Sequence, residues 1–101
     1  MAKVYIAGPM RGYPDLNFPA FHKAAENLEL GMWDVVNPAV LNPDPNADYV
    51  ECMRIDIKAL CDCDAIYLLR GWEMSEGANV EYNVARALKL KIIFEVDRMY
   101  D

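Results

Sequence analysis

Four short runs rich in Val, Ile, Leu and Tyr recur along this chain, and a longer stretch with helical periodicity separates each run from the next. The apolar runs span residues 3–8, 34–39, 64–69 and 91–96. Continuous apolar character is typical of strands that are buried on both faces of a parallel sheet. Parallel neighbours cannot be joined by a tight turn and need a crossover, usually a helix. The alternation therefore predicts an α/β fold.

Each intervening stretch also carries the residues that begin and end helices. The first helix is expected to follow an Asn17 cap and to stop at Gly31. The second is expected over residues 49–60 with Asp48 as its cap, and the third from Ser75 to about Leu90. Their inward stripes are Phe18, Phe21, Ala25 and Leu28 in the first helix and Tyr49, Met53, Ile57 and Leu60 in the second.

The order of these elements restricts the topology. Right-handed crossovers favour a doubly wound, flavodoxin-like or Rossmann-like three-layer sandwich, in which a four-stranded parallel sheet has the strand order 2-1-3-4. Residues 1–101 contain no repeat and no linker between domains, and are expected to form a single domain. Ligands of such sheets bind at the carboxyl ends of the strands, here between strands 1 and 3.

Composition argues against several classes of function. No apolar run approaches the roughly 20 residues of a membrane span, and the first residues lack the long apolar region of a signal peptide. A cytoplasmic protein without a membrane partner is therefore expected. The net charge is −6 with no basic tract, which argues against a nucleic-acid partner. Three cysteines suggest no disulfide framework, and the spacing of Cys61 and Cys63 is not that of a zinc site. We therefore expect no metal and no cofactor.

Two carboxylates fall on the expected inward faces of helices. Glu81 shares a face with Ala78, Ala85 and Leu88, and Asp56 lies at the edge of the apolar stripe that contains Leu60. A buried charge without a partner is expensive. Such residues therefore indicate either a functional site or a structural pair of groups.

Other candidate residues lie beside the expected ligand cleft, and each also has a structural explanation. Arg11, after strand 1, could hold an anion, whereas Gly-Pro after a strand is often only a turn. Tyr5, within strand 1, could be a core residue whose hydroxyl needs a partner. Ser75 could bind an anion or only cap its helix. Trp72, in the loop of residues 71–74, could stack on a base, serve an interface or be a partly exposed loop residue.

Three motifs together resemble a known superfamily. They read Tyr5-Ile-Ala-Gly8-Pro-Met-Arg11-Gly12, Arg54-Ile-Asp56 and Ser75-x-Gly77-x-x-x-Glu81. This pattern resembles the nucleoside 2-deoxyribosyltransferase superfamily. The similarity is greatest to small phage and bacterial relatives of unassigned function and to the 2′-deoxynucleoside 5′-monophosphate N-glycosidases. The glycines Gly8, Gly12 and Gly77 of these motifs are expected to border the substrate.

The resemblance implies a role for each matching side chain. Glu81 would be the nucleophile that attacks the anomeric carbon and displaces the base, and Tyr5 would hydrogen bond to it and orient it. Asp56 would contact the sugar and assist the leaving base. Arg11 and Ser75 would hold a 5′-phosphate. The resemblance also implies a homo-oligomer.

Three hypotheses for the function follow. The first is cleavage of an N-glycosidic bond, or base transfer, on a (deoxy)nucleoside or its 5′-monophosphate. The second is a non-catalytic module that sequesters or senses a nucleotide, and the third is a structural domain whose acids are merely paired. The presence of Tyr5, Asp56 and Glu81 together favours the first over the third. The sequence leaves the first and the second open.

Overall fold

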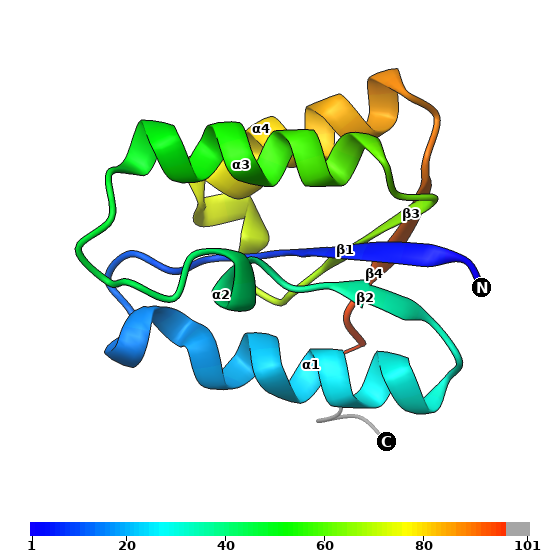
Figure 1. Cartoon of the computed structure of the whole chain (residues 1–101), viewed down its shortest axis with the longest axis horizontal. Helices are drawn as coiled ribbons and strands as arrows, with labels where there is room; N and C mark the ends of the chain where they lie inside the picture. The colour runs from blue at the N-terminus through cyan, green and yellow to red at the C-terminus, as the bar shows by residue number, and fades with distance from the viewer. Residues whose placement is uncertain (97–101) are drawn as a thin grey trace.

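A four-stranded, all-parallel sheet lies between two layers of helix in the computed structural model, which describes residues 1–96 (Figure 1). The strands are β1 (Lys3–Ala7), β2 (Asp34–Val36), β3 (Ala65–Leu68) and β4 (Lys91–Phe94). They are arranged in the order β2-β1-β3-β4. The fold class and the strand order predicted from the sequence are both confirmed.

The helices divide between the two faces of this sheet. Helix α1 (Phe18–Leu30) covers one face, and α3 (Tyr49–Cys61) with α4 (Glu76–Ala87) covers the other (Figure 1). A short helix α2 (Pro38–Leu41) follows β2, and two 3-10 turns, η1 (Pro14–Asn17) and η2 (Trp72–Met74), follow β1 and β3. None of the helices described within residues 1–96 is both long and apolar enough to cross a membrane.

Strand β1 supplies side chains to both halves of the core, because successive strand residues point to opposite faces. Ile6 packs with Phe21 and the rest of the cluster beneath α1. Tyr5 and Ala7 point the other way and join Leu60 in the cluster beneath α3 and α4. Tyr5 is therefore fully buried, on the face of the sheet that α4 covers.

Several predicted boundaries are wrong by a few residues, and one of these differences has a clear local cause. The second strand ends at Val36, not at Ala39, because the Asn37 side chain accepts a hydrogen bond from the Ala39 amide and caps helix α2. Pro38 fits the first turn of that helix, where its missing N–H is not needed. The last helix ends at Ala87, before the predicted Leu90, and Leu88, which was expected on its buried face, lies just beyond the helix and is 48% exposed.

The start of α1 also departs from the prediction. Asn17 lies at the expected cap position, but its backbone is left-handed and its side chain makes no capping bond. The side-chain amide of Asn17 instead donates a hydrogen bond of 2.9 Å to the Pro9 carbonyl, and so connects η1 to the loop that follows β1. The caps predicted at Asp48 and Ser75 are confirmed, since each side chain accepts a hydrogen bond from the first turn of its helix.

Candidate active site

A cleft of about 400 Å³ opens at the carboxyl ends of β1 and β3, where the topology places ligands. The loop after β1, one side of α3 and the first turns of α4 form its walls. The lining residues are Gly8, Pro9, Met10, Arg11, Tyr13, Tyr49, Cys52, Met53, Asp56, Met74, Ser75, Glu76, Gly77, Ala78 and Glu81. Segments that are distant in the sequence thus meet at the predicted position.

Glu81 lies at the base of this cleft with only 5% of its surface exposed. Its neighbours one turn away on α4, Ala78 and Ala85, are both buried, and their small side chains let the helix lie close to the sheet. The Tyr5 hydroxyl, on β1, donates a hydrogen bond of 2.5 Å to Oε2 of Glu81. A strand residue and a helix residue 76 positions apart thus hold the carboxyl group in one orientation.

Asp56 is the second acid of the cleft and is 7% exposed. Its Oδ1 accepts a hydrogen bond of 2.8 Å from the side-chain amide of Asn42, which lies just after α2. Sequence reasoning missed Asn42, because its stretch reads as a turn-rich linker. The only sequence signal was a side-chain amide in that linker, which on its own does not point to a buried acid.

Burial dominates the protonation of this cluster. It raises the pKa of Glu81 to about 8; the nearby Asp56 charge adds to the rise and the Tyr5 hydrogen bond opposes it. Burial also raises the pKa of Asp56 to about 6, while the hydrogen bond from Asn42 and the nearby Tyr5 hydroxyl oppose the rise. Near neutral pH the two acids therefore hold about one proton between them. The pKa of Tyr5 is raised well above its ordinary value by burial and by the Glu81 charge, so the phenol remains a donor.

Glycine is required at the point where the loop leaves β1. A Cβ on Gly8 would lie 2.7 Å from Cβ of the buried Leu69, so any other residue would push the loop away from β3. Gly12 has a φ of +84°, which favours glycine, but it does not line the cleft. Gly77 lines the cleft, and a Cβ there would approach Sδ of Met53 at 3.3 Å.

Arg11, Tyr49 and Ser75 lie around the mouth of the cleft. The Arg11 guanidinium lies over the Tyr49 ring, 4.2 Å from its centroid. Oγ of Ser75 accepts a hydrogen bond of 3.2 Å from the Ala78 amide and so caps α4, whose N-terminus opens into the cleft. The exposed Glu76 lines the same mouth and contributes a negative charge.

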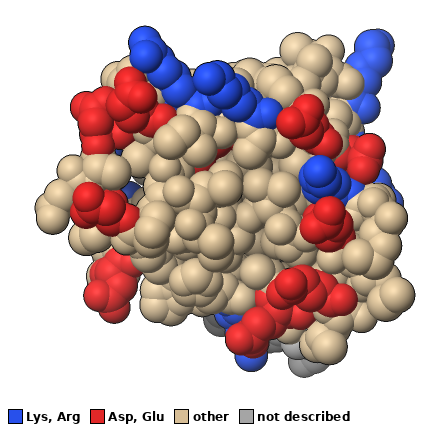
Figure 2. Space-filling view, in the orientation of Figure 1, with Lys and Arg blue, Asp and Glu red and all other residues tan. Residues whose placement is uncertain are grey.

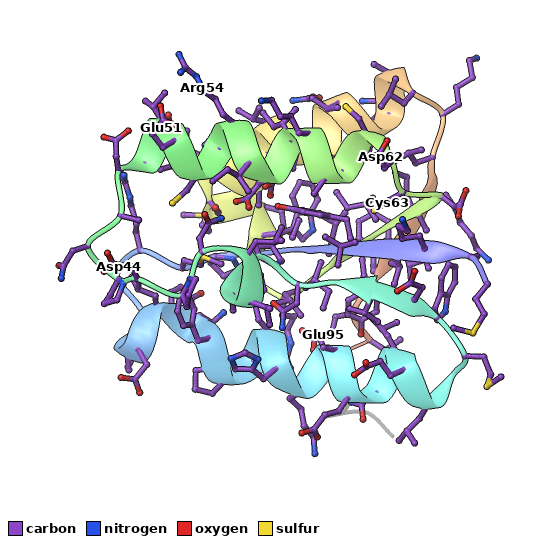
Figure 3. All side chains as sticks on the ribbon, in the orientation of Figure 1. Asp44, Glu51, Arg54, Asp62, Cys63 and Glu95 are labelled. Carbon is purple, nitrogen blue, oxygen red and sulfur yellow. The ribbon has the colours of Figure 1, made fainter. Side chains whose placement is uncertain are left out.

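Two other predicted positions lie outside the cleft. Trp72 packs against Tyr82 and Phe94, with ring centroids 4.7 and 6.2 Å away, and does not line the cleft. Its position therefore gives no support to stacking on a base within the cleft. Arg54, from the second motif, points away from the sheet and pairs with Glu51 at 3.2 Å on the outer side of α3 (Figure 3).

A second hollow, of about 510 Å³, lies between α1, β2 and α2, and its lining includes His22, Glu26 and Glu29. It contains neither of the two buried acids. Charged side chains lie mostly around the rim of the face shown in Figure 2, with an uncharged centre. No group of three or more His, Cys, Asp or Glu side chains within residues 1–96 is arranged to hold a metal ion.

Comparison with known families identifies the family of this chain. The model of a family described as a domain of unknown function (DUF4406) matches residues 2–94, and the chain therefore belongs to that family. No protein with a curated description matches it.

Proposed function

We propose that this member of the DUF4406 family cleaves the N-glycosidic bond of a (deoxy)nucleoside or its 5′-monophosphate, with Glu81 as the nucleophile. The observation that carries the proposal is the buried pair of Glu81 and Tyr5 at the base of a cleft that also contains Asp56. A carboxylate fixed by a hydrogen bond inside a cleft is the nucleophile of retaining glycosidases. The three motifs that resemble the nucleoside 2-deoxyribosyltransferase superfamily give independent support.

The proposed reaction has two steps. In the first, a Glu81 oxygen forms a bond to the anomeric carbon, the bond from that carbon to the base nitrogen breaks, and its electron pair leaves with the base. Protonated Asp56 gives its proton to the base. In the second, water or another base attacks the same carbon, returns a proton to Asp56 and releases Glu81 as a carboxylate.

The proton that the two acids share must move from Glu81 to Asp56 before the first step. Glu81 must be ionised to attack and Asp56 must be protonated to assist, whereas the resting preference is the reverse because the pKa of Glu81 is about 8 and that of Asp56 about 6. The reactive form is then roughly one molecule in a hundred, a cost of about 3 kcal/mol. The Tyr5 hydroxyl donates its proton in a hydrogen bond to Glu81, which favours the ionised form of that acid, as the first step requires.

We also propose that the 5′ end of the substrate is a phosphate. Arg11 is a fixed charge at the mouth of the cleft, and the N-terminus of α4 adds the positive end of a helix dipole. Glu76 opposes anion binding and limits its strength.

We also propose that the protein assembles into a homo-oligomer. Light scattering at tens of micromolar protein tests this proposal, and a monomer would contradict it.

The decisive experiment incubates the protein with the common nucleosides, deoxynucleosides and their 5′-monophosphates and measures free base by liquid chromatography. Base release by the wild type, absent in Glu81→Gln, is the expected result. A 2′-fluoro nucleotide should leave a sugar ester on the peptide that contains Glu81, detected by mass spectrometry. Nucleotide binding without base release or ester would instead favour a non-catalytic binding module.

A further inference from the structure

The contact between Arg11 and Tyr49 joins two separate walls of the cleft. Arg11 belongs to the loop after β1, and Tyr49 is the first residue of α3. The guanidinium carbon lies 4.2 Å from the ring centroid, within the range of a cation–π interaction. Among residues 1–96, Arg11 has no carboxylate at ion-pair distance. The aromatic ring is therefore the group that holds this charge.

The other end of the Tyr49 side chain lies close to Gly77. A Cβ on Gly77 would lie 3.4 Å from the Tyr49 hydroxyl oxygen and 3.8 Å from a carbon of its ring. The missing side chain at Gly77 thus lets the half-buried ring reach the first turn of α4. Because the ring extends from that turn to the loop after β1, its position fixes where the guanidinium rests.

A free arginine side chain loses much rotational freedom when it binds an anion. If a ring already restrains the guanidinium beside the anion site, part of that cost is met before the ligand arrives. A cation–π contact at an exposed site corresponds to about a two- to five-fold effect on an equilibrium. A leucine at the same position would fill space but offer no aromatic face.

We propose that Tyr49 is a positioning residue for Arg11, and that it thereby sets the preference of the cleft for phosphorylated over unphosphorylated ligands. The inference rests on the proposed function in one respect, namely that the cleft binds a nucleoside or nucleotide. Tyr49 acts through Arg11, so its influence falls on the anionic end of the ligand and not on the base or the sugar.

The test compares dissociation constants by isothermal titration calorimetry in the Glu81→Gln background, which prevents consumption of the ligand. The probes are the four common 2′-deoxynucleosides and their 5′-monophosphates. Tyr49→Leu should lower the ratio of monophosphate to nucleoside affinity by about two- to five-fold. Tyr49→Phe keeps the ring and should keep the ratio. Arg11→Ala should lower the ratio further, and adding Tyr49→Leu to it should cause no additional loss.

A matched control comes from the second cation–π pair, in which Arg86 lies 5.7 Å from the Tyr82 ring centroid on α4. Arg86→Ala removes one positive charge that does not line the cleft and should not change the ratio. A thermal melt of each variant reports folding, and because the readout is a ratio of two affinities, a general loss of folded protein does not imitate the effect.

Two results would overturn the inference alone. An equal loss of nucleoside and monophosphate affinity in Tyr49→Leu would mean that the ring contacts the base or the sugar. A gain in monophosphate affinity would mean that Tyr49 holds Arg11 away from the ligand. Base release by the wild type, combined with either result, would leave the proposed function intact. Failure of every probe to bind at millimolar concentration would overturn both proposals.

Discussion

Replacing Glu81 by glutamine should stabilise the folded protein at alkaline pH and hardly change its stability near pH 5. Glutamine has nearly the shape of a protonated glutamate, and its Oε1 can still accept the hydrogen bond from Tyr5. It cannot ionise, however, so it removes the cost of a charge in a side chain that is 5% exposed. The effect of the substitution should therefore depend strongly on pH.

The direction in which the stability of the wild type changes with pH follows from the protons bound by the folded and unfolded states. Burial raises the pKa of Glu81 from 4.5 in an exposed setting to about 8 in the fold. Between these two values the folded protein keeps a proton that the unfolded chain has released, so the stability of the wild type falls as the pH rises. At 1.36 kcal/mol per unit, the loss grows to about 5 kcal/mol above pH 8, and it is under about 1 kcal/mol at pH 5. The glutamine variant is spared this loss.

Urea unfolding between pH 5 and pH 9, followed by the fluorescence of Trp33 and Trp72, measures the difference directly. The titration of Asp56 affects both proteins and largely cancels when they are compared. Glu76→Gln is the matched control, because it removes an exposed carboxylate from the same helix and should change stability by no more than about 0.5 kcal/mol.

This reasoning would be refuted if the difference in the free energy of unfolding between the two proteins did not change with pH. It would also be refuted if the wild type became more stable relative to the variant as the pH rises. The second result would mean that Glu81 is ionised and paired in the fold. In that case, removal of its charge should cost roughly 3–5 kcal/mol at neutral pH, as for a broken structural pair.

Three further outcomes are expected. The kcat/KM for base release, measured in a stopped assay across pH 4.5–9.5, should show a bell-shaped dependence on pH. It should fall below about pH 6 and above about pH 8, the pKa values of Asp56 and Glu81. A flat profile would exclude a catalytic role for both acids. Tyr5→Phe should lower kcat/KM about ten- to hundred-fold and move the Glu81 limb to higher pH, because a hydrogen bond that favours the carboxylate is lost. Gly8→Ala should lower the free energy of unfolding by about 1–3 kcal/mol, since its methyl group overlaps Leu69, and urea unfolding with an unchanged midpoint would contradict the close approach.

Much of the candidate site could be predicted because its signals are local. The buried position of Glu81 could be predicted because its neighbours on one helical face include alanines, which are typical of a helix that packs close to a sheet. Tyr5 could be predicted as a residue within an apolar strand whose hydroxyl needs a hydrogen-bond partner. Strand order followed from the handedness of crossovers, which requires only the sequence of elements.

The unpredicted features depend on contacts between distant segments. Asn42 bonds to Asp56 only because α2 shortens β2 and turns the linker toward α3, and α2 in turn depends on the Asn37 cap. Trp72 packs against Phe94, a residue of the last strand, so its surroundings could not be inferred from its own loop. Tertiary packing decided both positions where local patterns were neutral.

The two parts of the cleft are held by different portions of the fold. Tyr5 and Glu81 are fixed by the sheet and by the close packing of α4, whereas Arg11 is an exposed loop residue that rests on the first residue of α3. A mutation in the first pair changes a buried side chain, whereas a mutation in the second changes a side chain at the mouth of the cleft. If the proposed function holds, descendants of such a protein can diverge in the molecules they bind while inheriting the same proposed nucleophile, and laboratory evolution of new specificity should begin at Arg11 and Tyr49.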